Sequence, residues 1–342
     1  MCGIIGYVGP RVAKDVVVAG LKRMEYRGYD SAGVAVIAEG AIQVRKKAGK
    51  IGNLIGELDA APLADTRIGI GHTRWATHGA PNDINAHPHL SADGRVALIH
   101  NGIIENFATL RAELRAAGTV LTSETDTEVA AHLLAREVEA GSSLADAMRA
   151  VCRRLEGAFT LVAIDALEPG RLVAARRNSP LVVGVGEGEN FVASDVSAFI
   201  EFTRKAIELG QDQVVEVTTD RIEITDFFGA PAESHPYEVT WDLSAAEKSG
   251  YDWFMRKEIF EQPRAVADTL LGRFTSDGEL QLDEIRIGEA ELRSIDKIII
   301  VACGSAYYAG LVAKYAIEHW TRIACEVEIA SELRYRDPII TR

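Results

Sequence analysis

Between Ala158 and Thr225 the chain consists of short β-rich runs separated by turn residues, and this pattern constrains its fold most strongly. Antiparallel strands can be joined by short turns, whereas parallel strands need crossover connections of a dozen or more residues. The pattern therefore predicts an antiparallel sheet system rather than alternating parallel units. Its strands are expected at residues 159–164, 172–175, 181–185, 191–193, 214–217 and 222–224.

The first half of the chain supplies helices as well as strands. After a first strand within residues 2–8, apolar spacing predicts helices at 12–24, 51–58, 105–116, 125–139 and 144–155. Further strands are expected at 34–37, 42–44 and 96–99. Thr125 and Glu128 have the spacing of a capping box, which marks a helix start. The polar, glycine-bounded segment at 69–79, continuing to residue 89, is predicted to be a loop.

The pattern changes after residue 227, which marks a domain boundary. A linker begins at Phe228-Gly229-Ala230-Pro231, and a helix-rich region at 241–274 is expected to break at Gln262-Pro263. A strand at 297–302, a helix at 307–319 and a strand at 325–329 then predict a βαβ unit of a parallel sheet. We therefore divide the chain into a first domain at 1–227, a linker at 228–250 and a second, incomplete domain at 251–342.

Composition excludes several functional classes. The net charge of −13 argues against nucleic acid as a partner, because phosphate binding needs basic clusters. The longest uncharged run, Ile298 to Ala313, is shorter than the roughly 20 residues that span a bilayer, and no signal peptide is visible. The four cysteines show no paired spacing. A cytoplasmic protein without a membrane partner is expected.

Cys2 becomes the first residue once Met1 is removed, and its thiol and α-amine then lie within one residue. With unperturbed pKa values of about 8.5 and about 7.7–8.0, the thiol can pass its proton to the amine through one bridging water near neutral pH. Cys2 would then be a nucleophile with its own base, the principle of N-terminal threonine nucleophiles. The alternative is a small buried residue at the start of a strand.

Three polar segments contain further candidates. The Arg74 guanidinium suits bidentate capture of a carboxylate, and Trp75 could wall or gate a pocket; a surface salt bridge and core packing are the alternatives. Asn101 and the Gly102 N–H could form an oxyanion hole, although Asn-Gly is also a strong hairpin-turn signal. Asp126 could receive an ammonium group or stabilise a helix start. Arg74 and Asp126 together would hold both ends of an α-amino acid.

No metal or nucleotide fingerprint is present. The sequence spacings of His72, His78, His87 and His89 match no compact zinc-binding motif. Gly304-Ser305 follows a predicted buried strand and opens a helix, whose N-terminus could hold a phosphate. No Walker or dinucleotide pattern accompanies it.

Seven motifs occur in order along the chain. Together they closely resemble the glucosamine-6-phosphate synthases, the glutamine–fructose-6-phosphate aminotransferase family. The motifs are MCGIIGY at 1–7, YRGYDSAG at 26–33, GHTRWATHG at 71–79, HNGIIEN at 100–106, SETDTE at 123–128, KEIFEQP at 257–263 and VACGSAY at 301–307.

The resemblance implies an α+β N-terminal-nucleophile hydrolase domain with four αββα layers at 1–227, which is a class II glutamine amidotransferase (glutaminase) domain. An incomplete α/β parallel-sheet sugar-isomerase domain would occupy 251–342. With Cys2 as nucleophile, the implied oxyanion-hole and substrate-binding residues are Asn101, Gly102, Arg74, Asp126, Thr77, His78 and Arg27. Trp75 would gate an ammonia path. The rim of a sugar-phosphate site would be formed by Cys303, Gly304 and Ser305. Ser305 stands where the family more often has threonine.

The implied reaction is hydrolysis of L-glutamine to glutamate and ammonia. In the full-length family enzyme the ammonia is destined for fructose 6-phosphate, giving glucosamine 6-phosphate. The resemblance implies no cofactor and no metal, and a homodimer is one of the assemblies left open. Because the isomerase domain is incomplete, we expect the chain to act as a glutaminase only. The alternatives are a class II amidotransferase with a different acceptor and a non-catalytic sugar-phosphate-binding or regulatory module.

Overall fold

The structure, a computed structural model, describes residues 2–239, 251–270, 287–336 and 338–340. It divides into two compact units, Met1–Ile259 and Phe260–Arg342. The first unit contains two antiparallel sheets, and the second contains a pair of parallel strands. No helix among the described residues is long and apolar enough to cross a bilayer.

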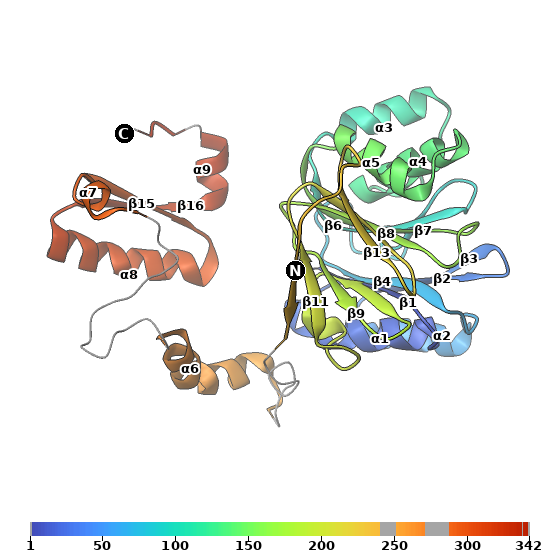
Figure 1. Cartoon of the computed structure of the whole chain (residues 1–342), viewed down its shortest axis with the longest axis horizontal. Coiled ribbons are helices and arrows are strands. Elements are labelled where there is room, and N and C mark those ends of the chain that lie inside the picture. The colour runs from blue at the N-terminus through green and yellow to red at the C-terminus, as the bar shows by residue number, and fades with distance from the viewer. Residues whose placement is uncertain (1, 240–250, 271–286, 337, 341–342) are drawn as a thin grey trace. The chain divides into compact units, whose positions relative to one another are not determined.

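An eight-stranded antiparallel sheet forms one central layer of the first unit (Figure 1). Its order is β14–β11–β9–β10–β1–β4–β2–β3, so that β1 lies in the middle of the sheet, between β10 and β4. The strands are β1 (Gly3–Val8), β2 (Ser31–Ala38), β3 (Ala41–Ala48), β4 (Ile68–Arg74), β9 (Val182–Val185), β10 (Asn190–Ala193), β11 (Lys205–Leu209) and β14 (Ser234–Glu238).

A six-stranded antiparallel sheet forms the second central layer. Its order is β13–β12–β8–β7–β6–β5. The strands are β5 (His89–Leu90), β6 (Val96–Ile104), β7 (Gly157–Asp165), β8 (Leu172–Arg177), β12 (Gln213–Val217) and β13 (Ile222–Asp226). The antiparallel system predicted for residues 158–225 is therefore confirmed, but it is divided between two sheets.

Helices cover the outer face of each sheet (Figure 1). The eight-stranded sheet packs against α1 (Ala13–Arg23) and α2 (Ile51–Ala60), and the six-stranded sheet against α4 (Asp126–Glu139) and α5 (Leu144–Arg154), with α3 (Phe107–Ala116) packed on α4. Along β1, Ile5 and Tyr7 face the helices, whereas Ile4 and Val8 join the core between the sheets. This alternation on a sheet buried on both faces produces the predicted four αββα layers. Short 3₁₀ turns at Glu25–Arg27 and Val196–Ala198 complete the unit.

The loop predicted at 69–79 is wrong for its first part, because Ile68–Arg74 form β4 in the middle of the sheet. The glycines that suggested a loop serve close packing instead. A Cβ atom added at Gly71 would lie 2.3 Å from Val17 Cγ1 of α1. Every residue of β4 is buried, so the strand lacks the polar–apolar alternation that marks a half-exposed strand.

Asn101 and Gly102 do not form a hairpin turn. Strand β6 continues through both residues, which pair with Thr160 and Phe159 of β7. The helix break predicted at Gln262-Pro263 is also wrong, because α6 runs through Pro263 from Phe254 to Leu270. Pro263 is exposed, so that water can satisfy the carbonyl that the missing proline N–H leaves unpaired.

The predicted linker contains a strand. Ser234–Glu238 form β14, which pairs with β11 along the edge of the eight-stranded sheet. Pro236 and the polar neighbours hid this strand from sequence analysis, and an edge is where a sheet tolerates proline. Residues 240–250 of the predicted linker lie outside the described residues.

The second unit contains the predicted βαβ arrangement. Strands β15 (Lys297–Ala302) and β16 (Ala324–Ile329) pair in parallel, and α8 (Gly304–Thr321) connects them. Two short helices, α7 (Glu289–Leu292) and α9 (Ala330–Arg336), flank this arrangement in the sequence.

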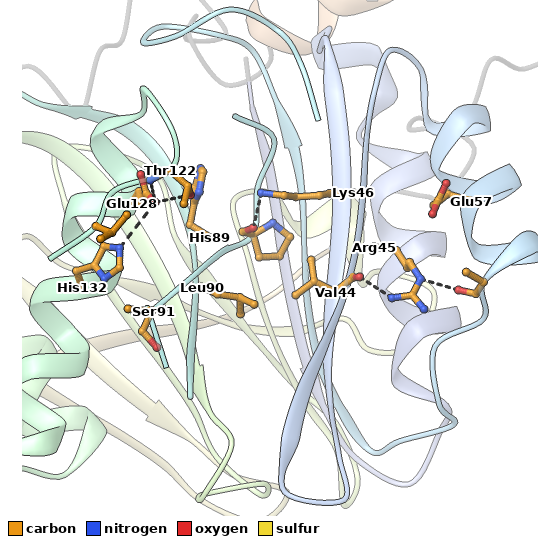
Figure 2. A pocket seen from close by; sticks show the side chains of 14 residues that line it. Val44, Arg45, Lys46, Glu57, His89, Leu90, Ser91, Thr122, Glu128 and His132 are labelled. Carbon is orange, nitrogen blue, oxygen red and sulfur yellow. Dashed lines mark hydrogen bonds and ion pairs between the residues drawn. The ribbon is translucent and has the colours of Figure 1, made fainter. Parts of the chain in front are cut away.

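The start of α4 is stabilised by an extended form of the predicted capping box. Thr125 is the N-cap, and its side chain accepts from the Glu128 N–H at 3.2 Å. The Glu128 carboxylate reaches further back, to the N–H and hydroxyl groups of Thr122 and Ser123 at 2.7–2.8 Å. Although burial opposes the charged form, the neighbouring His132 ring and these hydrogen bonds hold the pKa of Glu128 well below its usual range. Figure 2 shows Glu128 and Thr122 at one wall of a pocket of about 570 Å³.

Replacing Glu128 by glutamine is therefore expected to destabilise the fold. The amide has one acceptor oxygen instead of two, so buried donors of Thr122 or Ser123 lose their partner, which costs about 2 kcal/mol. Urea denaturation at pH 7 measures this loss. Glu57→Gln is the matched control, because Glu57 lines the same pocket and its carboxylate makes no hydrogen bond or ion pair with the described residues. Equal stability of the two variants would contradict the prediction.

Candidate active site

Cys2 lies directly before β1, at the end where this strand pairs with the end of β4. The Trp75 N–H donates to Cys2 Sγ at 3.1 Å, and the Trp75 carbonyl oxygen lies 3.6 Å from the same sulfur. The neighbouring Gly3 N–H donates to Thr73 Oγ1 at 3.0 Å. The backbone after β4 therefore holds the thiol in place.

The surroundings of Cys2 disfavour the thiolate form. Burial raises its pKa, while the Trp75 N–H and the positive charge of Arg74 oppose this change. A thiol in this state becomes a nucleophile only when a base takes its proton. The geometry alone does not activate Cys2, so a nucleophilic role needs a proton acceptor such as its own amine.

Asn101 reaches Cys2 from the second sheet. Its Nδ2 donates to the Cys2 carbonyl at 3.3 Å, and its Oδ1 lies 2.8 Å from His72 Nε2. Gly102, the next residue of β6, has φ of +119°, and a Cβ there would lie 2.0 Å from the Ala158 carbonyl oxygen. Only glycine fits this position. The Asn101 side-chain amide is thus a potential oxyanion-hole donor close to Cys2, and the Gly102 N–H is the next donor along β6.

Arg74 is buried and has an unused donor. Its Nη2 donates to the carbonyls of His78 and Gly79, the latter at 3.3 Å, whereas Nη1 is buried without a hydrogen-bond partner among the described residues. Burial lowers the pKa of Arg74, and the carboxylates of Asp30 and Asp126 oppose this change. With 4% exposure, Arg74 does not form the surface salt bridge considered as an alternative. A buried donor without a partner favours the binding of an anion.

Asp126 begins α4 and faces the same region. Its Oδ2 accepts the Ile104 N–H at 2.9 Å and lies 3.9 Å from His78 Nδ1 and 3.8 Å from His100 Nδ1. The start of a helix favours a carboxylate, so a structural role of Asp126 is fulfilled in any case. Asp126 is also close enough to Arg74 for their charges to interact.

Trp75 and Thr77 lie exposed on the segment that follows β4. Trp75 is 56% exposed, so that core packing, the alternative to a gate, is excluded. The segment is anchored by Asp30, whose Oδ2 accepts the Ala76 N–H at 2.5 Å. Sequence analysis did not single out Asp30; its place in the YRGYDSAG motif was the available signal.

Arg27 contacts the segment that follows β10. Its Nη1 lies 3.4 Å from both the carbonyl oxygen and the hydroxyl of Ser194 and 3.5 Å from an Asp195 carboxylate oxygen. The Ser194 hydroxyl also accepts the Ile4 N–H of β1 at 3.0 Å. These contacts position the start of β1, and a role of Arg27 in substrate binding stays a prediction.

A row of buried histidines lies beside the site. The rings of His72 and His87 stack at 4.3 Å, and those of His87 and His89 meet edge to face at 4.9 Å. Burial lowers the pKa of all three, that of His72 to about 3, so the rings are neutral at pH 7. Within the described ranges, no group of three or more His, Cys, Asp or Glu residues is arranged to hold a metal ion.

The predicted sugar-phosphate residues lie in the second unit. Cys303 is the N-cap of α8, and Gly304 and Ser305 form its first turn. All three are exposed, and Gly304 has φ of +60°. A free N-terminal turn after a parallel strand suits an anion, and binding of a sugar phosphate there stays a prediction.

Two family models match the chain. One is described as a glutamine amidotransferase domain and matches residues 72–201, which include Arg74, Asn101 and Asp126. The other is described as a SIS domain and matches residues 291–342.

Curated relatives match nearly the whole chain. A Streptomyces coelicolor protein is 67% identical over 340 residues, which cover 99% of this chain and 55% of that protein. A Corynebacterium efficiens protein is 62% identical over 99% of this chain, and a Mycobacterium tuberculosis protein 58% identical over 100% of it. All three are named glutamine–fructose-6-phosphate aminotransferase (isomerizing). The chain spans 55–56% of the length of these relatives.

Solved structures share the fold. Glutamine phosphoribosylpyrophosphate amidotransferase from B. subtilis matches with a TM-score of 0.59 and 20% identity, over 95% of this chain and 65% of that one. A structure described as the allosteric regulatory enzyme of purine biosynthesis matches with a TM-score of 0.57 and 26% identity, over 66% of this chain and 49% of that one. The first unit thus has the four-layer fold of N-terminal-nucleophile hydrolases, and nearly the whole chain is similar to the first part of glutamine–fructose-6-phosphate aminotransferases.

Proposed function

We propose that this chain, freed of Met1, hydrolyses L-glutamine to glutamate and ammonia with Cys2 as nucleophile. The proposal rests mainly on the contact between Cys2 and Asn101. Asn101 comes from the other sheet, and its side chain donates to the Cys2 carbonyl at 3.3 Å. We assign this reaction to a glutaminase domain at 1–227, followed by a linker at 228–250 and the start of a sugar-isomerase domain at 251–342.

Substrate binding would use the two charged groups beside Cys2. The unpaired Nη1 of Arg74 supports capture of the glutamine α-carboxylate, and the Asp126 carboxylate would receive the α-ammonium group. His78, whose carbonyl already accepts from Arg74 and whose ring lies 3.9 Å from Asp126, would shape the pocket between them, together with Thr77 and Arg27.

The chemistry would proceed in two steps. The α-amine of Cys2 takes the thiol proton through a water, and the thiolate attacks the side-chain amide carbon of glutamine. Asn101 Nδ2 and the Gly102 N–H stabilise the oxyanion, the C–N bond breaks, and ammonia leaves with the proton held by the amine. Water then hydrolyses the γ-glutamyl thioester, which releases glutamate and restores the thiol.

In the longer proteins of the family, we propose that this ammonia converts fructose 6-phosphate to glucosamine 6-phosphate. The shared name of relatives that match 99–100% of this chain supports that acceptor over a different one. Trp75, exposed beside Cys2, would gate the ammonia path, and Cys303, Gly304 and Ser305 would contact the sugar phosphate. We further propose that the protein is cytoplasmic and pairs as a homodimer, without nucleic-acid or membrane partners.

The test compares two forms of the chain whose N-terminal masses are known. The form that begins at Cys2 is expected to release glutamate and ammonia in equal amounts from glutamine. A form with extra residues before Cys2 has no free Cys2 amine and is expected to lose at least about 100-fold in kcat. Full activity of the blocked form would refute the mechanism. Inactivity of both forms would favour a non-catalytic binding module.

A further inference from the structure

His72 lies between the two sheets, next to a candidate catalytic amide. It belongs to β4, where Ile68 and Ile70 alternate with it and fill the core between the sheets. The ring is fully buried, and its Nε2 lies 2.8 Å from Asn101 Oδ1. The same Asn101 side chain uses its Nδ2 toward Cys2. His72 therefore contacts a side chain that joins the second sheet to Cys2.

The direction of the Asn101 amide depends on this contact. An asparagine amide has a donor side and an acceptor side, which its surroundings must distinguish. If Nε2 of His72 carries the proton, Oδ1 of Asn101 accepts it and the NH₂ group faces Cys2. If Nδ1 carries the proton, Nε2 becomes an acceptor, and the amide would turn its oxygen toward the Cys2 carbonyl, placing two acceptors 3.3 Å apart.

The contacts of the ring favour the proton on Nε2. His72 Nε2 lies 2.8 Å from the Asn101 amide, which is a stronger hydrogen-bond partner of the ring than the His100 backbone, and Nδ1 is buried without a hydrogen bond of good geometry to the described residues. Burial also lowers the pKa of His72 to about 3, which excludes a ring with both nitrogens protonated at neutral pH. The stacked ring of His87, at 4.3 Å, keeps the imidazole from tilting away.

We propose that His72 is a positioning residue for glutamine hydrolysis: its Nε2–H donates to Asn101 Oδ1 and thereby holds the Asn101 NH₂ group toward the oxyanion that forms at Cys2. This role rests on the proposed function. His72 itself touches neither substrate nor thiol in this arrangement. Its effect therefore belongs to the transition state, where the oxyanion exists, and not to glutamine binding.

Matched amide substitutions test the role. The side-chain nitrogen of His72→Gln reaches the place of Nε2, whereas that of His72→Asn reaches only the place of Nδ1, and both put a neutral amide in the same buried position. We expect His72→Asn to lower kcat for glutamine by about 10²-fold or more with KM within about threefold, and His72→Gln to recover most of kcat. Equal kcat values for the two variants, or a loss confined to KM, would overturn the proposal.

A double-mutant cycle separates positioning from a general loss of structure. Asn101→Ala removes the group that His72 is proposed to orient, so adding His72→Asn should lower kcat by no more than about threefold further. An undiminished second loss would show that His72 acts through something other than Asn101. Circular dichroism and urea denaturation establish that each variant is folded.

The ring proton can also be observed without any activity. Long-range ¹⁵N–¹³C correlation spectra of histidine-labelled wild-type chain, with the His72 signal assigned by its loss in His72→Gln, are expected to show an Nε2-protonated neutral ring at pH 7. A proton on Nδ1 overturns the proposal even if the variants have no measurable activity. If the Cys2-initiated chain does not hydrolyse glutamine, the proposed function fails, and the spectrum still decides how His72 holds Asn101.

Discussion

Replacing Cys2 by alanine is expected to abolish glutamine hydrolysis, lowering kcat by about 10⁵-fold or more. Loss of a covalent nucleophile removes the entire acyl-enzyme route, and what remains is the weak effect of binding and oxyanion stabilisation. The fold should survive, because Cys2 lies directly before β1 and, among the described residues, the hydrogen bonds of its thiol are with the Trp75 backbone. Coupled detection of glutamate and ammonia measures the loss.

Cys152 provides the matched control. It is a fully buried thiol in the core beneath α5, and burial raises its pKa, so it has no route to a thiolate. Cys152→Ala should keep kcat within about twofold of wild type, at a stability loss of about 1 kcal/mol. A thiol-alkylating reagent should label Cys2 faster than Cys152 in the folded wild type. Substantial glutamine hydrolysis by folded Cys2→Ala would show that Cys2 is not the nucleophile.

The second large effect is a loss of stability between pH 7 and pH 5. His72, His87 and His89 are buried as neutral rings, and burial depresses their folded-state pKa values below the unfolded value of about 6.5. Below pH 6.5 the unfolded chain therefore binds more protons than the folded one, and stability falls as pH falls. For His72, with a folded pKa of about 3, the loss by pH 5 is about 2 kcal/mol.

Charged neighbours of these three histidines both raise and lower the pKa values of the rings. The cations Arg74 and Lys46 further disfavour protonation of the rings, whereas Glu128 favours it for His89. The three histidines should together steepen the acid transition, each by at most about 1.4 kcal/mol per pH unit. Urea denaturation at about one-unit intervals, at pH 7.0, 6.0 and 5.0, gives the slope of the unfolding free energy against pH.

His87→Gln is expected to flatten that slope by about 1 kcal/mol per pH unit, because it removes one group that cannot be protonated in the folded state. Its stability at pH 7 is expected to fall, so the slope and not the absolute value is compared. His235→Gln is the control, since His235 lies exposed on β14. If His235→Gln changed the slope as much as His87→Gln does, the buried histidines would not be the origin of the pH dependence.

Local patterns predicted most helices and several strands to within a few residues. The helix at 144–155 corresponds to α5 at Leu144–Arg154, and the strand at 297–302 is β15. These elements carry their own signal: a periodic apolar face, or an uninterrupted apolar run between polar residues. β4 and β14 lacked that signal. The first is buried on both faces and contains glycines required by close packing, and the second is a polar edge strand held only by pairing with β11.

The sequence by itself determined the chemistry available to this protein: a cysteine after Met1, an arginine, an asparagine–glycine pair and an aspartate, in motifs that together resemble the glutamine–fructose-6-phosphate aminotransferases. What only the tertiary structure decided is how these groups meet and which neighbours orient them. Cys2 and Asn101 come from different sheets, and His72 and Asp30 reach the site through contacts that no spacing encodes. The physical reason is that periodicity reports burial along one element, whereas the direction of an amide or the partner of a guanidinium depends on side chains that the fold brings together from distant segments.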